Sequence, residues 1–231
     1  MTASKQKEIK KAVLMAFPHT IPVLTGYLIL GMAYGILMQT KGYGAFWSVL
    51  MSLVAYGGSM QFAAIALLTS VFNPLQAFLL SLMVNARHLF YGISMLDKYK
   101  GLGKARAILI FMLSDETFSI SSSVAPPQEV NRKYFFLTIS VLDYLYWAVG
   151  TFLGSVIGGF ITFNTAGLDF VLTALFVVLF LEQTKQKENQ TAGVIGLLAA
   201  IVGRLMFGAE NMVIPSMVII LLVLLLGRKK I

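Results

Sequence analysis

The residues of this chain best suited to chemistry are ionisable side chains that lie inside long apolar stretches. Asn85, Arg87 and His88 lie together near the end of one stretch, and Tyr91 follows one helical turn later. An ionisable group inside a membrane costs about 3 kcal/mol or more unless it is paired or hydrated, which makes it a functional candidate. The Arg87 guanidinium can bind a carboxylate through two parallel hydrogen bonds, and a histidine titrates near neutral pH. The cluster is therefore typical of a site that binds a carboxylate or carries a proton.

Acidic residues occupy two further apolar stretches. Asp143 stands alone in one of them, three residues before Tyr146. Asp115 and Glu116 are adjacent in the other, so on a helix their side chains point about 100° apart. One of these two can pair with Arg87 while the other meets water or a ligand, and the sequence leaves open which does which. The alternative is an ion pair that only holds two helices together.

A helix break is predicted at Gly57, Gly58 and Ser59, which interrupt an otherwise apolar segment. An unwound helix there would expose backbone amides and carbonyls to a ligand, with the Gln61 side chain close by. If the helix runs through, Ser59 and Gln61 are instead hydrogen-bonding residues between helices. The segment 105–125, which contains two acids and several serines, is the second place where a broken or re-entrant helix is expected.

The surrounding sequence is that of an integral membrane protein. Of its 231 residues, 58% are apolar and only 12% are charged, whereas a soluble domain has about 25% charged residues. The net charge of +8 includes short basic flanks at both ends of the chain, which are typical of cytoplasmic anchors and not of a nucleic-acid surface. The chain has no cysteine and two histidines, so we expect no disulfide, no metal site and no cofactor.

The apolar segments predict an all-α fold, a polytopic integral membrane bundle of about six to eight transmembrane segments that includes one or two broken or re-entrant helices. The bundle would form a single domain at 18–227, between a basic segment at 1–17 and a basic tail at 228–231. The first apolar segment lacks a small-residue cleavage site, so we expect it to remain uncleaved. The expected segments are 18–39, 45–72, 74–96, 105–125, 133–161, 168–182, 191–206 and 211–227.

The Lys and Arg residues predict which loops face the cytoplasm, because cytoplasmic loops carry an excess of them. Eight full crossings would put eleven basic residues inside and five outside, and four of those five lie between 98 and 106. If neither interrupted segment crosses fully, that cluster moves inside and the balance becomes fifteen to one. Both arrangements place the two termini in the cytoplasm.

Glycine patterns predict where helices pack closely. Gly31 and Gly35 form one GxxxG motif, and Gly150, Gly154 and Gly158 form two in series. Small residues at this spacing let helix backbones approach each other in lipid. We expect these five glycines to lie at helix contacts, either within this chain or with a partner subunit.

Matching spacings also predict an internal repeat. Each of the two glycine patterns follows a tyrosine at the same distance, and a second pair of stretches ends in a glutamine. Duplicated halves are a common construction in transporters. We interpret the halves as 18–96 and 133–206, and the alternative is coincidence among common apolar residues. The matching stretches are 27–35 with 146–154 and 49–61 with 171–183.

Four motifs resemble those of one known membrane-protein family. In this order and at about these spacings they are similar to the AzlC family, and the resemblance covers roughly residues 12–206. It implies the large subunit of a branched-chain amino acid exporter of the AzlC/AzlD or YgaZ/YgaH type, which works with a small AzlD-type membrane subunit in the plasma membrane of a bacterium. The motifs are Gly57–Ala64, Val84–Met95, Asp115–Ser119 and Gly167–Phe170.

The resemblance implies export of a valine-like amino acid driven by an ion gradient, most simply of protons, since no Walker A motif (GxxxxGK[ST]) occurs. Arg87 or the amides near Gly57 would bind the substrate carboxylate, and an acidic side chain would bind its ammonium group. Proton coupling would involve His88, Asp115 and Glu116, although His88 can equally be a plain packing residue. The expected substrate site comprises Ser59, Gln61, Asn85, Arg87, Tyr91, Glu116 and Asp143, with Phe62, Phe90 and Phe118 as apolar lining.

Other function classes use the same residues. A passive channel or pore for small polar solutes would line its path with the same polar cluster, and it is the main alternative. An intramembrane protease would need a GxSG or HExxH motif or a suitably ordered aspartyl pair, and none occurs, so we expect no enzyme. A purely structural subunit would leave the buried charges as an unexplained cost.

Overall fold

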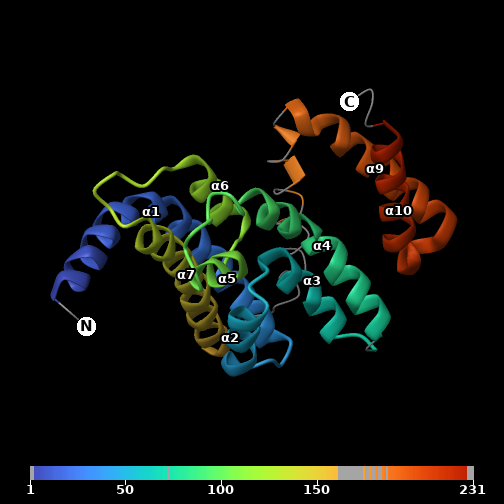
Figure 1. Ribbon diagram of the computed structural model, residues 1–231. Coiled ribbons are helices and arrows are strands. Elements are labelled where there is room, and N and C mark those ends of the chain that lie inside the picture. The colour runs from blue at the N-terminus through green and yellow to red at the C-terminus, as the bar shows by residue number, and fades with distance from the viewer. Residues whose placement is uncertain are drawn as a thin grey trace. The chain divides into compact units, whose positions relative to one another are not determined.

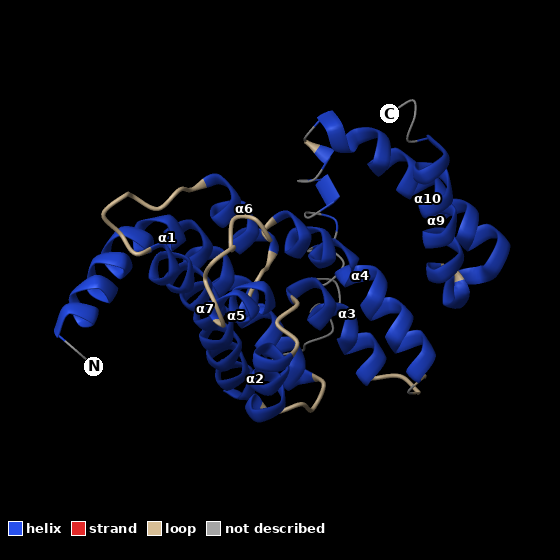
Figure 2. Ribbon diagram, in the orientation of Figure 1, coloured by secondary structure: helices blue, strands red, loops and turns tan. Residues whose placement is uncertain are grey.

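The computed structural model describes residues 3–71, 73–160, 174, 177, 180–181, 184–185 and 187–227. These residues are helical or lie in turns and short loops, and none of them belongs to a strand (Figure 2). The predicted all-α fold is therefore confirmed. The chain divides into two compact units, Met1–Asn73 with Val84–Phe163 and Pro74–Met83 with Asn164–Ile231.

The helices are labelled in Figure 1. In the described part of the chain, three stretches are long and apolar enough to cross a membrane: Lys5–Thr40, Arg132–Phe160 and Gln190–Gly208. Two further apolar helices, α2 and α3, fall short of the roughly 20 residues that a crossing needs. The helices are α1 (Ala3–Thr40), α2 (Ala45–Val54), α3 (Gly58–Leu68), α4 (Pro74–Ser94), α5 (Ala105–Phe111), α6 (Asp115–Ser123), α7 (Arg132–Phe160), α9 (Lys187–Asn211) and α10 (Val213–Gly227).

Helices α1 and α7 lie side by side and make the most extensive helix contact of the first unit (Figure 1). They run in the same direction, since Thr20 of α1 hydrogen-bonds Tyr146 of α7, and further along both helices Ser155 donates to the carbonyl of Gly35. With 38 residues, α1 is about 57 Å long at 1.5 Å per residue, well beyond the ~30 Å of a bilayer core. The helix therefore has length to spare for its basic N-terminal segment outside the lipid.

The predicted glycines lie on the shared face of α1 and α7. A Cβ atom added to Gly31 would lie 2.9 Å from the Trp147 carbonyl oxygen, and one on Gly150 would lie 2.8 Å from the Tyr27 carbonyl oxygen. Gly35 and Gly154 are tighter still, and Gly158 would place a Cβ 3.0 Å from that of Gln39. Only hydrogen at these positions lets the two backbones come this close.

Helices α2 and α3 form a pair that folds back on itself. The chain breaks between them at residues 55–57, so the predicted interruption is confirmed at Gly57, whereas Gly58 and Ser59 already belong to α3. The Tyr43 hydroxyl, just before α2, donates a 2.8 Å hydrogen bond to the carbonyl of Leu68 at the end of α3. The two outer ends of the pair therefore lie together, and the break lies at the opposite end of the pair.

Helices α5 and α6 form a second pair of this kind, with its break at residues 112–114. The Lys98 ammonium, in the turn before α5, donates a 2.7 Å hydrogen bond to the carbonyl of Ser122 near the end of α6. Arg132, the first residue of α7, donates to the carbonyl of Lys98. The entrance of α5, the exit of α6 and the start of α7 therefore share one end of the unit.

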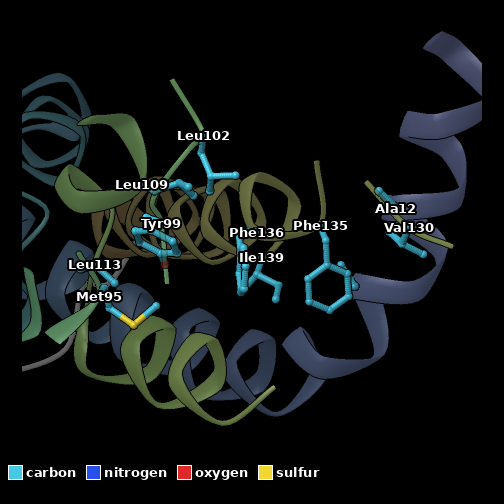
Figure 3. Close-up of a cluster of buried hydrophobic side chains, with 11 residues drawn as sticks. Ala12, Met95, Tyr99, Leu102, Leu109, Leu113, Val130, Phe135, Phe136 and Ile139 are labelled. Carbon is cyan, nitrogen blue, oxygen red and sulfur yellow. The ribbon is translucent and has the colours of Figure 1, made fainter. Parts of the chain in front are cut away.

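A buried apolar cluster holds this end together (Figure 3). It joins the N-terminal part of α1 to the turn after α4, to α5 and to the start of α7. A 2.6 Å ion pair between Lys11 and Glu129 and a hydrogen bond from Asn131 to Glu8 add polar contacts. The cluster consists of Ala12, Ala16, Met95, Tyr99, Leu102, Leu109, Leu113, Val130, Phe135, Phe136 and Ile139.

These contacts bear on the two predicted topologies within the first unit. Both interrupted segments fold back on themselves, and the basic cluster between 98 and 106 lies at the same end of this unit as the N-terminal segment of α1. This favours the topology in which neither segment crosses fully, and the side of the membrane that each loop faces stays a prediction. The same contacts bring the α2–α3 pair and the α5–α6 pair into the unit from opposite ends.

In the second unit, helices α9 and α10 pack against each other. Gly203 of α9 lies directly against the buried side chain of Ser216 on α10. Gly208 takes a positive φ of 75° where α9 kinks, a conformation that glycine adopts without strain. The Gly167–Phe170 motif, and most of the stretch 171–183 that would repeat 49–61, lie outside the described residues, so the predicted repeat stays a prediction.

Candidate functional site

The break between α2 and α3 leaves the first turn of α3 open. Tyr56 has a φ of 41°, in the left-handed region that non-glycine residues seldom adopt, and no side chain caps the helix at Gly57. Both glycines fit a crowded place, because a Cβ on Gly57 would lie 3.3 Å from the Asn85 amide oxygen, and one on Gly58 would lie 3.3 Å from the Trp147 ring. The first amides of a helix have no intrahelical partner, so this turn can offer N–H donors to a ligand.

Arg87 joins this helix start to the acidic residues of α6. Its Nη2 atom donates to the Ser59 hydroxyl at 2.5 Å and lies 3.0 Å from Oδ2 of Asp115. The Tyr91 hydroxyl donates to the other carboxylate oxygen of Asp115 at 2.7 Å. The Arg87 and Asp115 side chains are 39% and 37% exposed, so the pair is only partly shielded from water. The Nε atom of Arg87 is buried and has no hydrogen-bond partner among the described residues, which leaves one donor unused.

The acidic pair begins helix α6. The Ser114 hydroxyl caps the helix by accepting a hydrogen bond from the Thr117 amide at 3.1 Å. Acidic side chains are favoured in the first turn of a helix by its dipole, so their place here is locally stable. Asp115 turns toward Arg87, whereas Glu116 accepts a 2.6 Å hydrogen bond from the Tyr27 hydroxyl of α1.

Asp143 is completely buried in α7, although no cation in the described part of the chain pairs with it. One of its carboxylate oxygens accepts a 2.8 Å hydrogen bond from the Thr117 hydroxyl, and the other has no partner within the described residues. The structure therefore separates the three acids: Asp115 lies beside Arg87, Glu116 lies at the exposed side, and Asp143 lies behind Thr117 in the interior.

Gln61 is also completely buried, and both ends of its amide are used. Its Nε2 atom donates to the Ser52 hydroxyl at 2.8 Å, and its oxygen accepts from the Trp147 indole at 2.8 Å. Ser52 in turn lies 2.9 Å from the hydroxyl of Thr151. These bonds tie α2 and α3 to α7, so the structure gives Gln61 the interhelical contacts that the sequence left open as an alternative.

The remaining predicted residues are distributed unevenly around the site. Tyr91 stacks on Phe118 with ring centroids 4.4 Å apart, and His88 meets Tyr91 edge to face at 5.6 Å. Phe62 is buried against Tyr34, away from the polar cluster. Phe90 is 69% exposed. Phe118 is therefore the only one of the three predicted lining aromatics that is in contact with the cluster in the described residues.

Sequence reasoning missed three residues that lie behind the site and hydrogen-bond its side chains, Tyr27, Ser114 and Trp147. Tyr27 stood out only for its place in the repeat, and a tyrosine in a membrane helix carries no mark of the partner its hydroxyl will find. Ser114 could have been recognised, since a serine directly before two acids and a threonine is a helix-capping pattern. No cluster of three potential metal ligands occurs among the residues described.

Comparisons with known proteins agree with these features. A family model described as AzlC protein matches residues 22–161. The chain is 45% identical to the branched-chain amino acid transport protein AzlC of Bacillus subtilis, over 98% of this chain and 89% of that protein. It is 40% identical to an uncharacterized membrane protein of Helicobacter pylori, over 96% of this chain and 98% of that one.

A more distant relative is the inner membrane protein YgaZ of Escherichia coli, 27% identical over 79% of this chain and 78% of that protein. No solved structure matches the chain. The family model covers more than half of the sequence and includes the helix break before α3, the Arg87 cluster and the acids of α6 and α7. These matches confirm the resemblance found in the motifs, and this protein belongs to the AzlC family.

Proposed function

We propose that this protein is the large subunit of a secondary transporter that exports branched-chain amino acids such as valine across the bacterial plasma membrane. Export is coupled to the proton gradient and involves a small AzlD-type membrane subunit. The printed name of the Bacillus subtilis relative, a branched-chain amino acid transport protein, supports the transport role and the substrate class. The bias of basic residues supports cytoplasmic termini.

The observation that carries the proposal is the Arg87–Asp115 pair between two helix breaks. Arg87 lies against the open first turn of α3, and Asp115 begins α6, whose break enters from the opposite end of the unit. An amino acid is a zwitterion, so it needs an anion-binding group and a cation-binding group a few ångströms apart. Two broken helices that meet inside a bundle are a common way to build such a site in transporters.

The substrate would bind by entering this ion pair. Its carboxylate would bind to Arg87, whose Nε donor is unused, to the Ser59 hydroxyl and to the free amides of α3. Its ammonium group would bind to Asp115, with Glu116 as the second acid nearby. The stacked rings of Tyr91 and Phe118 offer an apolar surface for the aliphatic side chain.

The test is efflux of labelled valine from preloaded cells that lack their own exporters and carry this chain with or without its small partner. Saturable efflux that a proton uncoupler abolishes is expected. Flux that neither saturates nor responds to the uncoupler would support a channel instead. No efflux from either strain, despite confirmed membrane insertion, would refute the proposal.

A variant at Arg87 tests the site itself. Arg87→Gln is expected to raise the KM for valine about tenfold or more, because a hydrogen-bonded charge contributes about 1.5–3 kcal/mol. Arg106→Gln removes the same charge at the start of α5 and is the matched control. Equal KM values for the two variants would contradict the assignment of Arg87.

A further inference from the structure

The full burial of Asp143 gives this acid a different environment from the other two. Its side chain is 0% exposed, and one carboxylate oxygen has no hydrogen-bond partner among the described residues. Burying an unpaired charge is costly, so a carboxyl in this position needs a proton or an approaching cation to neutralise it. A carboxyl group whose charge depends on the arrival of a proton or a cation is suited to coupling proton movement to transport.

A continuous chain of hydroxyl groups connects Asp143 to Glu116. The Glu116 carboxylate lies 2.6 Å from the Tyr27 hydroxyl, which in turn lies 2.6 Å from the Ser114 hydroxyl. Ser114 donates to the Thr117 hydroxyl at 3.0 Å, and Thr117 donates to Asp143 at 2.8 Å. Helices α1, α6 and α7 each contribute to this chain, so their packing sets every distance along it.

The two ends of this chain of hydroxyl groups differ in how far the protein buries them. Glu116 is exposed, whereas Tyr27, Ser114, Thr117 and Asp143 are buried. A buried row of hydroxyls is more than is needed to cap α6, since the cap uses only Ser114 and the Thr117 amide. The row therefore forms a path from an accessible acid to an inaccessible one.

We propose that Tyr27, Ser114 and Thr117 form a hydroxyl relay that carries the coupling proton between Glu116 and Asp143. This rests on the proton coupling in the proposed function and adds its pathway and its internal acceptor. Protonated Glu116 gives its proton to Tyr27 as Tyr27 gives its own to Ser114, Ser114 to Thr117 and Thr117 to Asp143. One proton leaves Glu116, one arrives at Asp143, and each hydroxyl has gained one and lost one.

The titratable groups around Asp143 are compatible with this transfer. Its titratable neighbours are Tyr56, from the break between α2 and α3, and Glu116, from α6, to which Tyr27 of α1 is hydrogen-bonded. None of these side chains carries a positive charge that would fix Asp143 permanently as a carboxylate. Arg87 pairs with Asp115 instead, which keeps its charge at the substrate end of the site.

The relay can be tested with the full-length chain, together with its small partner where valine transport requires it, reconstituted in lipid vesicles that contain a pH-sensitive dye. Exchange of labelled for unlabelled valine measures substrate handling without net proton movement. Valine-driven proton flux measures coupling. Tyr27→Phe is expected to keep exchange near the wild-type rate while it lowers proton flux by roughly a hundredfold, the scale of a lost proton-transfer group.

The matched control is Tyr34→Phe. It removes a buried hydroxyl from the same helix that takes no part in the chain of hydroxyl groups from Glu116 to Asp143, so it is expected to change neither rate. Thr117→Val tests the relay at a second point, should Tyr27→Phe not fold, and is expected to lose proton flux in the same way. Asp143→Asn removes the acceptor and is expected to lose proton flux as well.

The outcomes separate this inference from the proposed function. Wild-type vesicles that exchange no valine would refute both. If wild-type vesicles show both exchange and proton flux, and Tyr27→Phe or Thr117→Val, whichever folds, leaves the proton flux unchanged, the relay alone is refuted. Wild-type exchange with no proton flux at all would refute the relay and the proton coupling of the proposed function together, and would leave the transport of valine standing. Loss of proton flux with retained exchange in the relay variants, but not in Tyr34→Phe, would support the relay.

Discussion

The closest helix contact of the first unit makes a sharp prediction about Gly35. A Cβ atom at this position would lie 2.6 Å from the Ser155 amide nitrogen and 3.0 Å from the Gly154 carbonyl carbon, and closer still to the Thr151 carbonyl oxygen. Comfortable separations between such atoms are about 3.5 Å, so Gly35→Ala must push α1 and α7 apart by roughly 1 Å. Every one of these contacts is with backbone, which cannot rotate away.

The expected cost follows from this displacement. Overpacking costs about 1–3 kcal/mol, and alanine recovers up to about 1 kcal/mol through its better helix propensity. With the full gain in helix propensity, Gly35→Ala should therefore lower the free energy of unfolding by about 0–2 kcal/mol relative to wild type, and by about 1–3 kcal/mol relative to an alanine variant that shares that gain. Gly26→Ala, on the same helix, has nothing within 4 Å of the new Cβ and should be neutral or stabilising.

The free energy of unfolding can be measured by titrating the purified protein from mild detergent into a denaturing one while following tertiary structure. The informative quantity is the difference between the two alanine variants, because they share any change in helix propensity. A Gly35→Ala protein as stable as Gly26→Ala would show that α1 and α7 do not depend on close backbone contact, and the packing argument would fail.

Three further predictions concern topology, the glutamine network and pH. The natural chain has no cysteine, so a single introduced cysteine shows on which side of the membrane its position lies. A membrane-impermeant thiol reagent should label Lys104→Cys from the side of the N-terminus and Lys41→Cys from the opposite side. Labelling of both from the same side would contradict the re-entrant helix pairs. Gln61→Leu should lower the free energy of unfolding by about 1–3 kcal/mol, because it leaves the buried Trp147 indole without a hydrogen-bond partner and leaves the Ser52 hydroxyl with Thr151 alone. A valine KM that rises while stability stays at the wild-type value would instead indicate a substrate contact. A hydrogen bond and the positive charge of Lys11 hold the pKa of Glu129 below its usual value. The wild type should therefore be more stable than Glu129→Gln at neutral pH, and this difference in the free energy of unfolding should disappear as the pH falls through the lowered pKa. A difference that stays constant down to acidic pH would contradict this.

Local signals in the sequence were enough for the main elements of the fold. The Gly57-Gly58-Ser59 run and the acids at 115 and 116 predicted interruptions, and the structure breaks its helices at 55–57 and 112–114. Apolar length and the distribution of basic residues predicted the membrane bundle. These properties are local because lipid imposes them on each segment separately, through hydrophobicity and backbone hydrogen bonding.

The partners of each polar side chain could not be predicted in the same way. Gln61 and Asp143 look alike in the sequence, as single polar residues in apolar surroundings. In the structure Gln61 has both ends of its amide satisfied, whereas Asp143 has one oxygen without a partner in the described residues. The difference arises from neighbours on other helices, Ser52 and Trp147 in one case and Thr117 in the other, and therefore depends on the tertiary packing.

The contacts that hold the first turn of α3 differ in strength from the contact that joins α4 to α6. The α3 side is held to α7 by fully buried hydrogen bonds through Gln61, which are expensive to leave unmade. The link from α4 to α6 through Arg87 and Asp115 is more than a third exposed, and ion pairs of that kind contribute only about 0–1 kcal/mol. A zwitterion that replaces this one ion pair by two would therefore break no strong contact between α4 and α6. Ser114 caps α6, and Glu116 and Thr117 follow Asp115 on this helix, so any movement of α6 on binding would change the distances to Tyr27 and Asp143 as well. Substrate binding and proton transfer would then be linked through this one short helix, since Asp115 contributes to the first and its neighbours Ser114, Glu116 and Thr117 to the second.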